Sequence, residues 1–307
     1  MQKSYLSIYS ALVSNLLIAA TKFLAGSVSN SSAMISEGIH SLVDTVNELL
    51  LLWGIKQSNK PGDVSRPFGN GRELFFWSFI VSMLIFGLGG GISIYQGIIH
   101  MLHPEALQDP FWNYVVLYTS LLLEGISFYI AARAFNKLRN GQSWWQAIIN
   151  SKDPADFLVL FEDGAAVAGL LIVICCVWLG HHYNASYLDG LASLLVGLLL
   201  VGVSLVLARE SRSLLMGEGV TKKTRQRITA ITEMDDAAEK LLRLFSMYVG
   251  PEEILLLMDV QFKATLKMPG IHEAIDRIRG SIQKEYPKVK YMIIQPDIKN
   301  ESPDSAS

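Results

Sequence analysis

Four ionisable side chains interrupt an apolar stretch near the start of this sequence. The stretch covers about residues 33–55, which is long enough for a helix to cross a lipid bilayer. The ionisable residues recur at intervals of three and four positions, so a helix places them on one face: Glu37, His40, Asp44 and Glu48. Charged groups at bilayer depth cost several kcal/mol each unless they face a water-filled cavity, a partner or a cation. The stripe therefore predicts a ligand, and a divalent metal ion suits carboxyl groups and an imidazole best.

The composition is that of a protein with several membrane spans. Of the 307 residues, 50% are hydrophobic and only 18% are charged, a balance that soluble globular proteins rarely reach. The net charge of −2 gives no indication of a nucleic acid partner. Cys175 and Cys176 are adjacent, which argues against an ordinary structural disulfide and leaves no metal-binding spacing. We therefore predict an integral membrane protein without a resident cofactor, in contact with the lipid bilayer.

Six mostly apolar runs predict six transmembrane helices. The predicted spans are residues 6–28, 33–55, 74–102, 111–135, 157–179 and 187–208. The connections after the second and fourth runs contain Lys and Arg, whereas those after the first, third and fifth contain neither. The positive-inside rule then places both termini in the cytoplasm, and we expect the cell inner membrane. The first run lacks a small-residue cleavage site, which favours a retained span over a signal peptide.

The chain changes character after residue 212, where charged and polar residues become frequent. We predict a transmembrane transport domain at residues 1–212, a cytoplasmic α+β domain at residues 213–299 and a disordered tail at residues 300–307. Apolar runs and Gly/Pro punctuation divide the second domain into helix, strand, strand, helix and strand, at residues 222–232, 240–248, 254–265, 271–286 and 289–295. This α-β-β-α-β order predicts a small sheet with helices on one face.

The fifth predicted span supplies acids that could complete a metal site. Glu162 and Asp163 are adjacent, so on a helix their side chains point about 100° apart. We predict Asp163 as a metal ligand together with His40 and Asp44. Glu162 then lies beside the ion, available as a further ligand.

Four other acids lie within the predicted spans, and their roles stay open. Glu48, Glu124 and Asp189 are predicted pathway residues, although each could equally be hydrogen-bonded to a neighbouring helix. Glu37 either draws cations into the mouth of a cavity or lies at the extracytoplasmic interface without a function. Their positions in the predicted spans do not separate these alternatives.

Three motifs resemble those of the cation diffusion facilitator family of divalent-metal/proton antiporters. They are S-E-G-I-H-S-L-V-D at residues 36–44, R-P-F-G-N-G-R-E at residues 66–73 and Y-L-D-G-L-A-S-L-L-V-G at residues 187–197. The run E-D-G-A-A-V from Glu162 is similar to the branch that includes zinc transporter nine-type proteins. The resemblance covers most of the chain. It implies that the six spans form the transport unit, that the C-terminal domain is metallochaperone-like and that the protein is a homodimer.

The chain departs from the family pattern on the fifth span. Most zinc-type members carry a His four positions before the acid, where this chain has Val159, which cannot bind metal. The resemblance therefore implies a central site of His40, Asp44 and Asp163. The fourth group is Glu162, water or a carboxylate from another helix.

The accessory sites of the family are also altered. In the loop after the second span Asp63 remains, but Arg66 and Asn70 stand at the usual His positions. A guanidinium would repel a second cation, so we predict no metal in that loop. In the C-terminal domain Gln295 replaces a further His, and His272 could equally be an ordinary surface residue. The residues that match ligand positions there predict a weak site at most: Asp259, His272 and Asp297.

Together these features predict a divalent metal cation efflux transporter, a Zn²⁺/H⁺ antiporter with an intramembrane site. Metal requires a deprotonated carboxylate and a neutral imidazole, so metal and protons exclude each other at His40 and Asp44. A tetrahedral shell with one imidazole favours Zn²⁺, whereas an oxygen-rich shell would suit a Mn²⁺ or Fe²⁺ exporter. A membrane metal sensor or scaffold that does not transport is the alternative from another class. The predicted spans contain no H-E-x-x-H string, which is the motif of many zinc hydrolases, so we predict that the chain is not an enzyme.

Overall fold

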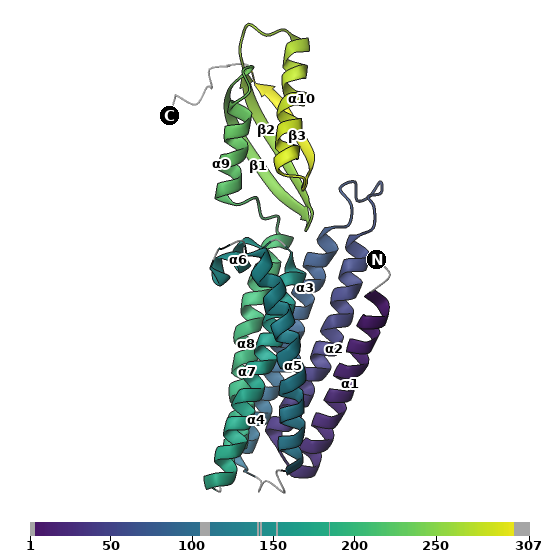
Figure 1. Ribbon diagram of the computed structural model, residues 1–307, viewed down its shortest axis with the longest axis vertical. Coiled ribbons are helices and arrows are strands. Elements are labelled where there is room, and N and C mark those ends of the chain that lie inside the picture. Colours follow the sequence, from purple (N-terminus) through teal and green to yellow (C-terminus); the bar gives the residue numbers. More distant parts are fainter. Residues whose placement is uncertain are drawn as a thin grey trace. The chain divides into compact units, whose positions relative to one another are not determined.

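The chain divides into two compact units (Figure 1). The structure, a computed structural model, describes residues 4–104, 111–139, 141, 143–151, 153–183 and 185–297. The first unit consists of Met1–Gln57 and Glu73–Arg212, and the second consists of Ser58–Arg72 and Ser213–Ser307. The predicted tail at residues 300–307 lies outside the described residues.

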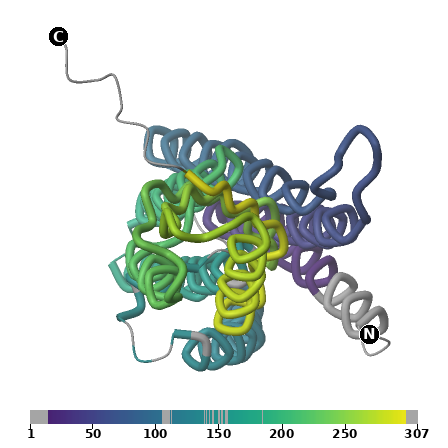
Figure 2. Tube along the Cα trace, turned by 90° about the horizontal axis from the view of Figure 1, so that it is seen from above, coloured from purple at the N-terminus to yellow at the C-terminus, as the bar shows by residue number. Residues whose placement is uncertain are grey.

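The first unit is a bundle of helices, seen from above in Figure 2. The helices are α1 Ser4–Ser29, α2 Ser32–Ser58, α3 Arg72–Leu84, η1 Ile85–Gly91, α4 Ile92–Leu102, α5 Phe111–Leu138, α6 Trp144–Asn150, α7 Pro154–Tyr183 and α8 Tyr187–Leu215. By length and composition, four stretches of the described chain are able to cross a membrane: Arg72–Leu102, Asn113–Lys137, Phe157–Tyr183 and Tyr187–Leu215. The described part of the chain also contains a shorter apolar segment, Asn15–Ser29 in α1. The polar stripe makes α2 less apolar than these stretches.

Two local features of the bundle are absent from the sequence prediction. The third predicted span is interrupted by η1, a π-helical turn in the glycine-rich part of the run. Helix α6 has only seven residues, so it gives no periodic signal. Its start is nevertheless encoded locally, because the Ser143 hydroxyl accepts a hydrogen bond from the main-chain N–H of Gln146.

Glycines bring α4 and α8 into close contact. A Cβ atom on Gly97 would lie 2.5 Å from the main-chain nitrogen of Leu194, and one on Gly197 would lie 2.7 Å from that of Ile94. These distances are too short for any side chain, so the two helices meet backbone to backbone. This contact fixes the position of α8 beside the third predicted span.

The second unit has the predicted α-β-β-α-β order. Its elements are α9 Lys222–Glu233, β1 Ala238–Gly250, β2 Glu253–Phe262, α10 Met268–Glu285 and β3 Val289–Asp297. The strands lie in the order β1-β2-β3, with β2 antiparallel to β1 and parallel to β3. Parallel pairing needs a crossover, and α10 supplies it. Alternate residues of β2, from Ile254 to Phe262, are buried, which is the pattern of a sheet covered on one face.

Helix α10 begins earlier than the sequence predicts. The sequence predicts a helix from residue 271, with Pro269 and Gly270 in the turn before it, whereas the helix already starts at Met268. Proline is tolerated in the first helical turn because its missing N–H has no acceptor there. A Gly/Pro pair therefore marks the start of this helix.

The segment between α2 and α3 packs on the sheet of the second unit. The ring of Phe68 meets the ring of Tyr291 in β3 edge to face, with centroids 5.2 Å apart. Arg72 Nη2 donates a hydrogen bond to the Met247 sulfur in β1 at 2.8 Å. These contacts explain why residues 58–72 belong to the second unit.

Candidate intramembrane cation site

Helix α2 turns its polar stripe toward the other helices. Glu37 and Asn47 are fully buried, and only 2% of His40 is exposed. Leu42 and Leu49, on the other side of the helix, are 41% and 49% exposed. The apolar residues thus face outward and the polar residues face the interior of the bundle.

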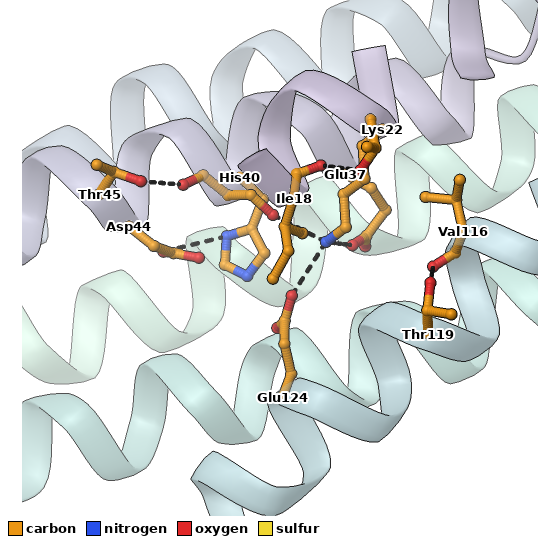
Figure 3. A network of polar contacts seen from close by, with 11 residues as sticks. Ile18, Lys22, Glu37, His40, Asp44, Thr45, Val116, Thr119 and Glu124 are labelled. Carbon is orange, nitrogen blue, oxygen red and sulfur yellow. Dashed lines mark hydrogen bonds and ion pairs between the residues drawn. The ribbon is translucent and has the colours of Figure 1, made fainter. Parts of the chain in front are cut away.

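His40 and Asp44 lie one turn apart on this face (Figure 3). His40 Nδ1 is 3.5 Å from Asp44 Oδ1, which is too long for a good hydrogen bond. In the described part of the chain, three buried polar atoms near the middle of α2 have no hydrogen-bond partner: His40 Nε2, Asp44 Oδ1 and Asn47 Oδ1. Buried polar atoms without a partner are costly, so this face is suited to a cation.

Helix α7 brings the two predicted acids to the same region. Glu162 Oε1 accepts a hydrogen bond from Asn47 Nδ2 at 2.7 Å, and Asp163 Oδ2 accepts one from Ser127 Oγ of α5 at 2.8 Å. The charges of both acids act on Asp44. Within the described residues, however, no three His, Cys, Asp or Glu side chains are close enough together to hold a metal ion. The predicted ligands therefore share one region without enclosing a single point.

A lysine that the sequence analysis did not consider lies beside these residues. Lys22 of α1 is completely buried, and its ammonium is 3.1 Å from Glu37 Oε2 and 3.1 Å from Glu124 Oε1 (Figure 3). It also donates to Ser41 Oγ at 2.8 Å. Glu37 and Glu124 thus share a cation supplied by the protein. The contacts join α1, α2 and α5.

Sequence signals for the two residues that were missed do exist. Lys22 is a lone cation inside a predicted span, which should have been matched to the acids of the other spans. Asn47 lies three positions after Asp44 and therefore on the same helical face. Neither signal identifies which acid is the partner, because that depends on how the helices pack.

Asp189 and Glu48 each have partners on other elements. Asp189 Oδ2 accepts hydrogen bonds from the main-chain N–H of Ser32 at 2.5 Å and of Ala33 at 3.2 Å, at the start of α2. The hydroxyls of Ser31 and Ser32 also donate to this carboxylate. Asp189 therefore caps α2 from α8. Glu48 Oε2 accepts a longer hydrogen bond from Asn15 Nδ2 at 3.4 Å.

The candidate ligands of the second unit have separate environments. The carboxylate of Asp259 accepts a hydrogen bond from Arg243 Nε at 2.6 Å. His272 lies on the surface of α10, and its Nε2 is 3.5 Å from Asp276. Asp297 ends β3. The described structure therefore gives these residues no shared contact.

The carboxylate of Asp63, in the segment between α2 and α3, is used in a local turn. It accepts hydrogen bonds from the Ser65 hydroxyl at 2.7 Å and from the main-chain N–H of Arg66 at 2.7 Å. These hydrogen bonds, that of the Ser65 hydroxyl first, lower the pKa of Asp63. Arg66 Nη1 in turn donates to Asn70 Oδ1. The three residues at the positions of the family's loop site are thus hydrogen-bonded to one another, Asp63 to Arg66 and Arg66 to Asn70.

Comparison with known proteins relates the first unit, the helix bundle, to transporters. The family model of the cation efflux transmembrane domain matches residues 8–216. The mitochondrial proton-coupled zinc antiporter SLC30A9 of Xenopus laevis is 35% identical over 243 residues, and the human protein of the same name is 34% identical over 251 residues. These alignments cover 78% and 81% of this chain, but only 44% and 43% of the two relatives. The chain thus spans less than half the length of either relative.

A bacterial relative matches along nearly its whole length. The manganese efflux system protein MneP of Bacillus subtilis is 27% identical over 293 residues, which cover 92% of this chain and 92% of that protein. The match therefore includes the second unit as well as the first.

Proposed function

This chain belongs to the cation efflux family, and on that premise we propose that it exports a divalent metal cation through an intramembrane site. It is an integral membrane protein, and its family is one of cation transporters rather than enzymes. The observation that carries the proposal is the row of buried, unpartnered atoms on α2, from His40 Nε2 through Asp44 Oδ1 to Asn47 Oδ1, as found in the described part of the chain. A cation bound between His40 and Asp44 would satisfy the first two atoms.

We infer a mixed nitrogen and oxygen coordination shell. His40 supplies the imidazole and Asp44 a carboxylate, while Asp163 supplies a second carboxylate from α7. Asp163 is bound to Ser127 through one oxygen, so a modest movement of its side chain would free it for the ion. The fourth position would be filled by Glu162, by Asn47 Oδ1, by a carboxylate from another helix or by water.

Zinc is the cation that this shell favours. One imidazole with carboxylates in a tetrahedral arrangement is typical of Zn²⁺, and two of the relatives are named as zinc antiporters. A shell enlarged by oxygen ligands would suit Mn²⁺ or Fe²⁺ instead, and one relative is named as a manganese efflux protein. We therefore propose Zn²⁺ first, with Mn²⁺ or Fe²⁺ as the alternative cargo.

Protons drive the cycle that we propose. A cation binds only when Asp44 and Asp163 are ionised and His40 is neutral, so protonation of these groups releases it. The bundle alternates between an opening on each side of the membrane, and protons return as the metal leaves. Exchange at one site thus couples the two fluxes without a second ion pathway.

The finer topology also belongs to the proposal. We propose six membrane spans, with α1 and α2 added to the four stretches that are apolar enough by themselves. Both termini would then lie in the cytoplasm, with the protein in the cell inner membrane as a homodimer. Helix α2 can span the membrane because its polar face is turned into the bundle.

Transport into liposomes tests the proposal directly. The purified chain is reconstituted, and uptake of Zn²⁺, Mn²⁺ and Fe²⁺ is followed with the vesicle interior acidic. We expect uptake that a protonophore abolishes and that Asp44→Ala reduces to the rate of empty liposomes. Among the described residues the hydroxyl of Thr119 bonds to main-chain carbonyl groups of its own helix, so Thr119→Ala is a control for correct insertion.

Two results would contradict the proposal. Undiminished uptake by Asp44→Ala would remove Asp44 from the site. Metal binding without uptake in either direction would instead support the sensor or scaffold, a function that the altered loop residues Arg66 and Asn70 also favour.

A further inference from the structure

We propose that Lys22 is a built-in cation that occupies a second cation position, between Glu37 and Glu124, and so limits the transport pathway to one divalent ion. The inference rests on the proposed function, because it assumes that the neighbouring site at His40 and Asp44 binds the cargo. Lys22 would then set how many divalent ions the pathway binds at one time.

The surroundings of the Lys22 ammonium are those of a cation site. Three oxygen atoms lie around the nitrogen, from Glu37 and Glu124 at 3.1 Å each and from Ser41 at 2.8 Å. They come from two helices, α2 and α5, whereas the ammonium comes from α1. A divalent metal binds oxygen at about 2.0–2.2 Å, so each ligand would need to approach by roughly 1 Å to hold one. An oxygen-only set of this kind suits Mn²⁺ at least as well as Zn²⁺.

The charge balance shows why the position needs a cation. Glu37 is completely buried and Glu124 is 18% exposed, and together they carry two negative charges when ionised. Lys22 neutralises one of these charges. Without it, two like charges would face each other at bilayer depth, which is costly unless a cation or protons compensate them. Loss of the ammonium would therefore leave a pair of carboxylates suited to a divalent ion.

Displacement of the Lys22 ammonium by a metal ion would be unfavourable at this position. Its ammonium is tethered to α1, and a metal that displaced it would leave a fully buried ammonium without a partner. Such an unpaired buried charge is strongly unfavourable. The cargo is therefore directed to His40 and Asp44, where the polar atoms are free of an internal cation.

A count of bound ions tests the inference. The full-length protein is purified in detergent, incubated with equal concentrations of Zn²⁺ and Mn²⁺, freed of excess metal and analysed by mass spectrometry of the elements. We expect one divalent ion in total per chain for the wild type and none for Asp44→Ala. Lys22→Gln should bind two ions, and Lys22→Gln combined with Asp44→Ala should retain one. Lys22→Arg, which keeps the positive charge, is the matched control and should bind one.

The possible failures are distinguishable. A wild type that binds no ion contradicts the proposed function, whereas a monodisperse Lys22→Gln that binds only one ion overturns the present inference. A wild type that binds two ions overturns it without any variant. If Lys22→Gln does not remain monodisperse, Glu124→Gln decides: it keeps the ammonium and should still bind one ion, and loss of that ion would show that Glu124 holds the cargo itself.

Discussion

Asp189 gives the sharpest test of whether an acid in the bundle is structural or belongs to the ion pathway. Its carboxylate accepts hydrogen bonds from the main-chain N–H groups of Ser32 and Ala33 and from two serine hydroxyls. In Asp189→Ala both N–H groups would be buried without this acceptor, at a cost of about 1–3 kcal/mol each. We expect a loss of about 4 kcal/mol in the free energy of unfolding, which is roughly a thousandfold in the folding equilibrium.

The isosteric variant Asp189→Asn refines this prediction. Its remaining oxygen can still accept a main-chain hydrogen bond, but the negative charge at the start of α2 is lost. We therefore expect about half the destabilisation of Asp189→Ala. Unfolding by sodium dodecyl sulfate in mixed micelles, followed by tryptophan fluorescence, measures both variants against the wild type.

A loss below about 1 kcal/mol in Asp189→Ala would refute the reasoning, since even one unsatisfied N–H should cost that much. A variant with the stability of the wild type but no metal flux would instead assign Asp189 to the ion pathway. The two roles thus give opposite patterns of stability and transport.

Two further predictions concern packing and pH. Gly197→Ala should lower the free energy of unfolding by about 1–3 kcal/mol, because the added Cβ would meet Ile94. The control is Gly202→Ala on the same helix, where an added Cβ has nothing within 4 Å and should be neutral or slightly stabilising. Equal effects of the two substitutions would contradict the close contact. In the second unit, the hydrogen bonds from Arg277 hold the pKa of Asp235 below its usual 3.8, so the stability from this pair is present above about pH 4 and is lost as the pH falls further. Asp235→Asn should flatten the dependence of thermal unfolding on pH between about 3 and 5, measured by circular dichroism, and an unchanged slope would remove Asp235 as its cause.

Patterns that depend on neighbouring residues in the sequence could be predicted. The order of helices and strands in the second unit follows from apolar runs and turn residues, and the inward face of α2 follows from the spacing of Glu37, His40 and Asp44. Even here a boundary was wrong, because Pro269 can mark the first turn of a helix as readily as the loop before it.

Pairing between helices could not be predicted in the same way. The spacing of the acids on α2 predicts an external cation, but Lys22 already neutralises part of the charge of Glu37 and Glu124. The partners of Glu162 and Asp163, on α2 and α5, likewise depend on the rotation and depth of three separate helices. Spacing within one helix fixes which face a residue occupies, and only packing decides what lies opposite.

The backbone contact between α4 and α8 has a mechanical consequence for a protein that opens alternately to two sides. No layer of side chains separates the helices at Gly97 and Gly197, so there is nothing between them that could shear. We therefore expect α4 and α8 to move together as one rigid body. We expect motion at the interface of α2 with α7, where Asn47 Nδ2 donates to Glu162 Oε1 a hydrogen bond that can break and re-form.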